Sequence, residues 1–215
     1  MERWGRRAAL AVALIGFAAL ALQYGIIVVK EAAAGLAPGP ALASGLWRFV
    51  GYFTILGNIF AAVVALAMAL APQSAAAGPR ARLSAAVAIL LIGIVYSLLL
   101  RHVWNPTGWQ AVADHALHDV LPPLFLIAWA LFPHGGLAFS DALWAMVLPL
   151  LYLAYALARG AYDGWYAYWF LDPTKLGAAH LALSAVLLAA GFLIVGLALV
   201  ALDRFLARRG PAGGS

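Results

Sequence analysis

The sequence contains no cysteine, which excludes disulfide scaffolds, thiolate metal sites, iron–sulfur clusters and a cysteine nucleophile. Charged residues are also scarce. They make up 10% of the 215 residues, whereas 66% of the residues are hydrophobic, and the mean hydropathy is +0.97. Water-soluble globular domains do not have this composition, so most soluble enzyme classes are excluded. The composition indicates a membrane protein.

Apolar runs of about 20 residues, the length that a helix needs to cross a bilayer, recur along the chain. We predict an all-α polytopic membrane protein, with one domain over residues 1–209 and a disordered, glycine-rich tail over 210–215. The domain is expected to be a bundle of six transmembrane helices at residues 8–29, 46–70, 82–101, 115–132, 141–160 and 178–203. The first run follows three arginines, as in a signal peptide, but it is longer than the roughly 7–15 residues of a signal-peptide core. We therefore expect it to be retained.

The distribution of basic residues predicts the orientation. Eight of the 13 lysines and arginines lie at the two ends of the chain or between the second and third spans, and five lie on the other side. The positive-inside rule then places both termini in the cytoplasm. Arginine outnumbers lysine 11 to 2, which with the abundant alanine suggests a bacterial source and a multi-pass protein of the inner membrane. No nucleic-acid partner is expected, because the basic residues form small groups at the ends of apolar runs.

Polar residues gather on the outer side of the predicted topology. A polar side chain inside a bilayer is costly, so its position is informative about function. Four of the five histidines lie in the outer half of the spans or in the outer loops. The outer side also carries the residues Trp47, Trp104, Trp109, Tyr162, Trp165, Tyr166, Tyr168 and Trp169, a pattern typical of an interfacial aromatic belt. On the inner side we expect His134 to be solvated and Asp203 to pair with Arg204.

Two segments carry the candidate chemistry. Thr54 and Asn58 are four residues apart, so they share one face of the second span, where ordinary helix packing is the alternative explanation. At the start of the fourth span, Asp114 and His118 also share a face, and a carboxylate one turn from an imidazole can support a general base. A solvated helix-end histidine is the alternative there. Pro122 removes a backbone donor and predicts a kink beside His118.

The expected depths of these two side chains are similar. Measured at 1.5 Å per residue from Trp47 and from Asp114, Thr54 lies ~10 Å and His118 ~6 Å below the outer boundary. A hydroxyl and an imidazole at such depths can meet. Thr54 is then a candidate nucleophile with His118 as its base, the usual way in which a weakly nucleophilic alcohol is activated.

These residues carry a resemblance to a known family. The motifs are Trp47-Arg48-Phe49 followed by Tyr52-Phe53-Thr54-Ile55-Leu56-Gly57-Asn58, then His115-x-x-His118-x-x-Leu121-Pro122, and Tyr166-x-Tyr168-x-Phe170-Leu171-Asp172. Over most of its length the chain resembles the bacterial branch of the androgen-induced gene family of six-span membrane proteins. Eukaryotic members are threonine hydrolases that cleave fatty acid esters of hydroxy fatty acids with one intramembrane threonine and one histidine. The resemblance matches these two residues to Thr54 and His118.

Residues and resemblance together predict an intramembrane lipid esterase whose site faces the outer leaflet. Its partners are a lipid with an ester bond and the membrane lipids, and no cofactor or metal is expected. Asn58, Arg101 and His115 are candidate oxyanion donors, Asp114 is a candidate for orienting His118, and Arg48 or Arg101 could hold a substrate carboxylate. Two alternatives stay open. One is a lipid-binding or transport protein without covalent chemistry, and the other is a haem protein in which His118 pairs with His180 or His102.

Overall fold

The computed structural model describes residues 2–209, in which every regular element is a helix and there is no strand. The tail predicted over 210–215 lies outside the described residues. Five of the helices are long and apolar enough to cross a membrane. They cover Arg3–Ala33, Phe53–Leu70, Pro79–Leu100, Phe139–Asp163 and Pro173–Arg208. The chain is thus an all-α protein with several apolar helices, as expected for a multi-pass membrane protein.

The helices follow one another with short connections. In chain order they are α1 (Glu2–Ala33), α2 (Pro38–Phe49), α3 (Phe53–Leu70), α4 (Pro79–Val95), α5 (Gly108–His115), α6 (Leu121–Ala130), α7 (Val147–Asp163) and α8 (Pro173–Arg209). A π-helical turn, Tyr96–Leu100, continues α4, and another, Ala116–Val120, joins α5 to α6. A 3-10 helix, Phe139–Met146, leads directly into α7.

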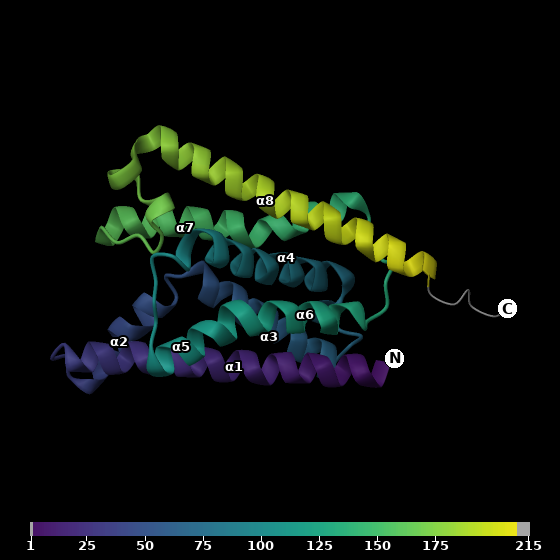
Figure 1. The fold of residues 1–215 in the computed structure, drawn as a ribbon, viewed down its shortest axis with the longest axis horizontal. Coiled ribbons are helices and arrows are strands. Elements are labelled where there is room, and N and C mark those ends of the chain that lie inside the picture. The colour runs from purple at the N-terminus through teal and green to yellow at the C-terminus, as the bar shows by residue number, and fades with distance from the viewer. Residues whose placement is uncertain (1, 210–215) are drawn as a thin grey trace.

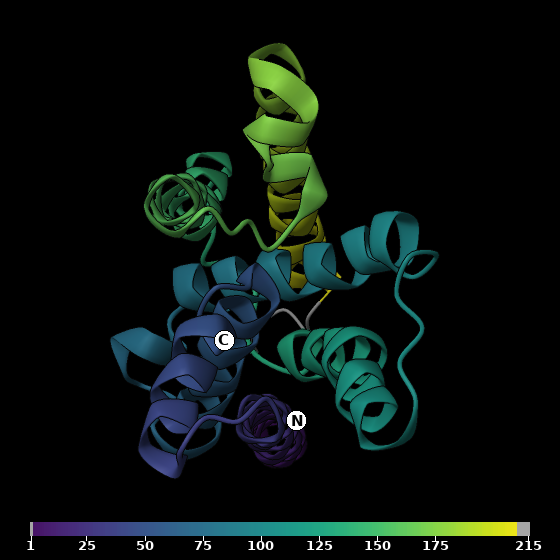
Figure 2. The same ribbon diagram turned by 90° about the vertical axis from the view of Figure 1, so that its left-hand side faces the viewer.

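The long helices run side by side along the length of the molecule (Figure 1). Seen from one end, α1, α3 and the α5–α6 segment lie on one side of α4, and α7 and α8 lie on the other (Figure 2). The beginning of α1 and the end of α8 are at the same end of the bundle (Figure 1). The main core lies where α1, α3, α4 and α6 meet, around fully buried side chains such as Met68, Val87 and Phe125.

The predicted second span is interrupted near its start. Residues 46–70 were expected to form one helix, but α2 ends at Phe49 and α3 begins at Phe53. The hydroxyl of Tyr152 on α7 donates to the carbonyl of Gly51 at 2.9 Å, which satisfies the backbone at the break. A Cβ at Gly51 would lie 2.4 Å from Nη1 of Arg159 and 2.6 Å from Cζ3 of Trp165, so a larger residue there would require both side chains to shift. The depth calculated for Thr54 along an unbroken helix is therefore wrong, and Thr54 lies in the first turn of α3.

The predicted fourth span is built from consecutive helical pieces instead of one regular helix. The π-helical turn Ala116–Val120 contains His118, and α6 begins at Leu121 with two prolines in its first turn. Pro122 has no N–H for the carbonyl of His118. That carbonyl lies beside Gly93 of α4, 3.2 Å from where a Cβ would be. The irregular turn and the close approach of α4 together fix the backbone at His118.

The opposite end of the bundle corrects two expectations. His134 is partly buried rather than solvated, with its side chain 9% exposed, and its Nδ1 lies 2.9 Å from Oδ1 of Asp203. Asp203 also accepts a hydrogen bond from the Gly135 N–H at 2.9 Å, so its partner is the segment after α6 and not Arg204. The guanidinium of Arg204 instead lies over the ring of Phe139. Sequence neighbours on α8 point in different directions, so Asp203 faces the bundle while Arg204 does not.

Candidate functional site

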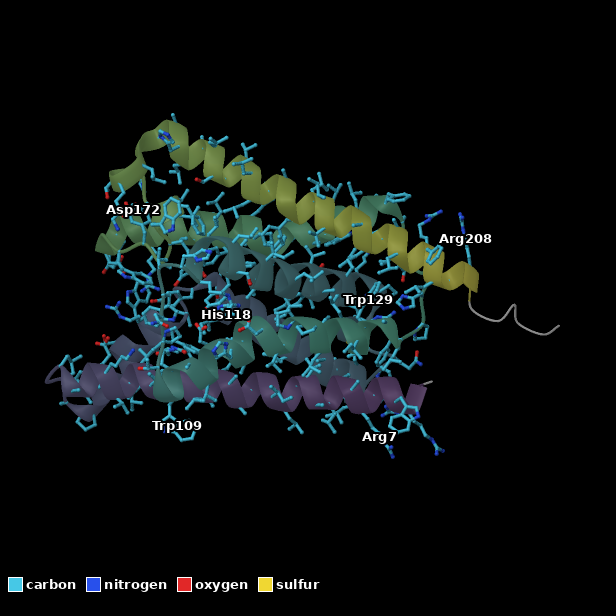
Figure 3. The ribbon with its side chains drawn as sticks, viewed as in Figure 1. Arg7, Trp109, His118, Trp129, Asp172 and Arg208 are labelled. Carbon is cyan, nitrogen blue, oxygen red and sulfur yellow. The ribbon has the colours of Figure 1, made fainter. Side chains whose placement is uncertain are left out.

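A cavity of about 650 Å³, hereafter the polar cavity, lies between the first helices of the bundle and the connection from α7 to α8. Side chains from α1, α2, α3, α5, both π-helical turns and residues 166–169 line it. Thr54 and His118 are both in its wall. His118 points into the bundle in the half away from Arg7 and Arg208, which mark the end with the chain termini (Figure 3). The structure thus brings the two candidate catalytic side chains, from α3 and the α5–α6 segment, to one cavity.

Thr54 is held by the hydroxyl of Tyr168. The first backbone N–H groups of a helix have no partner within the helix, and Thr54 is the second residue of α3. Its N–H donates to the Tyr168 hydroxyl at 3.2 Å, and its Oγ1 lies 3.2 Å from the same oxygen. If the tyrosine oxygen accepts the N–H, its own proton is available for Oγ1. The hydroxyl proton of Thr54 is then free to be given to a base.

His118 has a defined tautomer. Its Nδ1 lies 2.9 Å from the backbone carbonyl oxygen of Asp114, and a carbonyl can only accept a hydrogen bond. Nδ1 therefore carries the proton in the neutral ring, and Nε2 is left with its lone pair. The side chain is 9% exposed. A neutral, largely buried imidazole with a free Nε2 is suited to accept a proton from a hydroxyl.

Asp114 supports this arrangement through a tyrosine that was not among the predicted site residues. The Tyr96 hydroxyl donates to Oδ2 of Asp114, while Oδ1 lies 3.5 Å from His118 Nδ1. The Tyr96 ring is stacked on the imidazole, with 3.9 Å between centroids and 17° between planes. The expected contact between Asp114 and His118 is thus mainly a backbone hydrogen bond. The carboxylate and the stacked Tyr96 ring restrict how the imidazole can turn.

Three predicted site residues do not line the polar cavity. Asn58 is 1% exposed, and its Nδ2 donates to the carbonyl of Thr54 at 2.8 Å, one turn further along α3. His115 and Arg101 both pair with Asp119, where the His115 side chain is 59% exposed. The Arg101 guanidinium also lies over the Tyr96 ring. Asn58 therefore stabilises the first turn of α3, which carries Thr54. Arg101 and His115 lie at the surface of the molecule.

Arg48, the remaining predicted residue, lies in the wall of the polar cavity. Its Nε is 3.4 Å from Glu31 on α1, and its guanidinium lies over the Trp165 ring. Lys30 lines the same region and donates to Gln110 at 3.3 Å. These groups give the cavity a wall that is polar and partly cationic beside α1 and α2.

Tyr168, like Tyr96, contacts a candidate site residue but was not among the predicted site residues. It lies in the segment between α7 and α8, where its aromatic neighbours suggested an interfacial belt. Its side chain is buried, and burial raises the pKa of its hydroxyl. The phenol therefore stays protonated and can donate a hydrogen bond. The aspartate four residues later, Asp172, was an available signal, since it caps the start of α8 through Thr174 and so fixes this segment.

The remaining histidines do not join the site. His102 and His180 are exposed and are not in the wall of the polar cavity, and His180 bonds to a carbonyl of its own helix at 3.0 Å. Within residues 2–209, no three histidine, aspartate or glutamate side chains gather in a way that could hold a metal ion. The alternative in which His118 pairs with His102 or His180 therefore has no support from the positions of these side chains.

Comparison with protein-family models, with curated proteins and with solved structures found no match to this chain. The family resemblance of the motifs around Thr54, His118 and Tyr168 therefore remains a prediction from the sequence.

Proposed function

We propose that the chain is an intramembrane lipid esterase with Thr54 as its nucleophile and His118 as its general base. One observation carries the proposal: the Thr54 hydroxyl and the His118 imidazole, on separate helices, line one cavity, and the imidazole is oriented with Nε2 free. The sequence motifs around both residues point to the same pair. The substrate class is an ester of a fatty acid, including esters whose alcohol portion is a hydroxy fatty acid.

The reaction runs in two steps. Thr54 Oγ1 attacks the ester carbonyl carbon while its proton passes to Nε2 of His118. The ester C–O bond then breaks, the alcohol leaves with that proton, and the acyl group stays on Thr54. Water, deprotonated by His118, attacks the acyl-threonine and releases the fatty acid and the free hydroxyl.

The developing oxyanion needs a hydrogen-bond donor beside Thr54. Tyr168 is the best placed, because its hydroxyl already lies 3.2 Å from both Oγ1 and the backbone nitrogen of Thr54. A single donor of this kind typically lowers the barrier by about 3 kcal/mol. Asn58, Arg101 and His115 lie outside the wall of the cavity and are less suited to this role.

We further propose that the chain crosses the membrane six times, with both termini in the cytoplasm of a bacterial cell and the site toward the outer leaflet. The span that adds to the five long apolar helices is the α5–α6 segment, fourth in chain order. Its 23 residues from Gly108 to Ala130 extend for about 34 Å at 1.5 Å per residue. The common position of the beginning of α1 and the end of α8 is consistent with an even number of crossings (Figure 1).

Ester turnover by paired variants tests the proposed function. We expect Thr54→Ala and His118→Ala to lower kcat for a panel of long-chain fatty acid esters by at least about 1,000-fold, since residues of a catalytic pair act as a unit. Matched controls are Thr107→Ala and His180→Ala, which remove the same side chains at exposed positions outside the cavity. Both should keep wild-type rates. Lipid binding without turnover by the wild type would identify a binding protein instead.

A further inference from the structure

A second hollow, hereafter the apolar chamber, adjoins the polar cavity. It is narrow, about 80 Å³, and lies between α3, α4, α7 and α8. The two hollows share Thr54, Tyr96, Leu100 and Tyr168 in their walls. Thr54 is therefore at the boundary between a polar and an apolar compartment.

The wall of the chamber is almost entirely apolar. It consists of side chains such as Ile92, Val95, Leu153, Leu188 and Phe192. The tyrosine hydroxyls in the same wall are engaged elsewhere: with Asp114 for Tyr96, the Gly51 carbonyl for Tyr152 and Thr54 for Tyr168. An unbranched alkyl chain fits such a surface, because no buried polar group is left without a partner.

Some residues that line the chamber also lie at the surface of the bundle. Leu150 of α7 is in the chamber wall and is 50% exposed. On α8, Ala185 and Ala189 line the chamber, while Val186 and Leu187 are exposed on the adjoining face. That exposed face is apolar, as expected of a surface in contact with lipid chains. α7 and α8 lie apart at the end of the bundle away from the chain termini (Figures 1 and 2). An alkyl chain that enters the chamber sideways from the bilayer would pass beside these exposed apolar residues.

The position of His118 fixes which half of an ester occupies which compartment. His118 lines the polar cavity but not the chamber. In the proposed reaction it must protonate the leaving alcohol oxygen and later deprotonate water, so both have to be on its side of Thr54. The acyl chain stays on Thr54 between the two steps. It therefore has to lie on the other side of Thr54, where the apolar chamber is.

We propose that the part of the acyl chain next to the ester carbonyl lies in the apolar chamber, whose volume of about 80 Å³ holds a few methylene groups, and that the alcohol portion lies in the polar cavity. This inference rests on the proposed esterase function and adds the binding direction to it. It predicts selection for long, unbranched acyl chains, together with tolerance of varied, polar alcohol portions.

Filling the chamber tests the inference. Ala189→Trp adds a large side chain in the wall, and Ala190→Trp adds it one residue later at an exposed position, as the matched control. The assay uses p-nitrophenyl esters from acetyl to palmitoyl. We expect Ala189→Trp to lower kcat/KM for the palmitoyl ester by about tenfold or more, the loss of a few buried methylenes, and to leave the acetyl ester unchanged. Ala190→Trp should match the wild type on both.

A second ester series and a second variant keep the test decisive. Acetyl esters of alcohols of increasing length should be affected equally little by both tryptophans, and an effect of Ala189→Trp confined to long alcohols would overturn the inference. Ala185→Leu, a smaller addition in the same wall, should show the acyl-length effect in weaker form if Ala189→Trp fails to fold.

Photolabelling separates this inference from the proposed function. A palmitic acid carrying a diazirine within the first few carbons from its carboxyl group should label α8 and α4 residues of the chamber in the wild type, in Thr54→Ala and in Ala190→Trp, but not in Ala189→Trp. Chamber labelling without ester turnover by the wild type would reject the esterase and keep the chamber as an alkyl-chain site. Labelling that is confined to the polar cavity would overturn the binding direction.

Discussion

At the scale of single residues, the site depends on how Thr54 and His118 are held. Thr54 is at the start of α3, where its N–H has no helical partner and meets the hydroxyl of Tyr168 instead. His118 is held at Nδ1 by the carbonyl of Asp114 and against its ring by Tyr96. In the proposed reaction, both reactive atoms are thereby oriented by groups that do not themselves react. Such preorganisation lowers a barrier without any rearrangement during the reaction.

Tyr168→Phe removes one hydroxyl and keeps the ring that packs on Phe170. We expect kcat to fall by about 100-fold with little change in KM, because the lost donor acts mainly on the oxyanion of the transition state. Steady-state kinetics with a long-chain ester measure both constants. The control is Tyr162→Phe, which removes a hydroxyl from an exposed ring. A wild-type kcat for Tyr168→Phe would show that another group stabilises the oxyanion.

At the scale of elements, irregular backbone positions the site. The break between α2 and α3 places Thr54 in a first helical turn, and the π-helical turn Ala116–Val120 carries His118. The break is bound to α7 through Tyr152 and Gly51. Near the same end, Arg159 of α7 pairs with Asp163 at 3.2 Å and lies under the Trp47 ring of α2. These contacts explain why irregular turns can be kept in a helical bundle, since their polar groups are paired within the protein.

The link between α8 and the segment after α6 should contribute strongly to stability. Asp203→Ala removes the partner of His134 Nδ1 and of the Gly135 N–H, while Nε2 of His134 keeps the Ala130 carbonyl at 3.2 Å. We expect the free energy of unfolding to fall by about 3 kcal/mol. Thermal unfolding in detergent measures the change against Arg208→Ala, which removes an exposed charge from the same helix. Equal midpoint temperatures for the two variants would contradict this view of Asp203.

Sequence patterns predicted the elements far better than their irregularities. Hydropathy located the long apolar helices to within several residues, because burial in lipid acts on whole runs. The break at Gly51 depends on Tyr152 and Arg159, which are about 100 residues away and cannot be paired with it by pattern. The pairing of His115 with Asp119 follows from their spacing of four residues, which puts both side chains on one face of a helix. The contact of Tyr168 with Thr54 is long-range, and no periodicity reports it.

At the scale of the whole molecule, the arrangement of the helices defines two ends. Trp129, whose ring centroid lies 4.6 Å from that of His134, is toward the end with the chain termini, and His118, in the wall of the polar cavity, is toward the other (Figure 3). Arginines dominate the first end, as Arg7 and Arg208 illustrate. The proposed orientation puts that end in the cytoplasm, where the positive-inside rule favours it.

The lack of cysteine makes this orientation directly measurable, since a single introduced thiol has no competitor. Gln73 lies between α3 and α4, and Thr107 lies just before α5; both are exposed. In intact bacterial cells, we expect a membrane-impermeant maleimide to label Thr107→Cys. Gln73→Cys should be labelled only after the membrane is permeabilised. The reverse pattern would mean that the site faces the cytoplasm.

The most direct test of the whole account is to identify the nucleophile by mass spectrometry after reaction with a long-chain alkyl fluorophosphonate. The phosphorus should bond to Thr54 Oγ1 with loss of fluoride, and the adduct should form much more slowly in His118→Ala. The account would be contradicted if the reagent abolished ester turnover of the wild type through an adduct on a different residue, and if the same adduct still formed in Thr54→Ala.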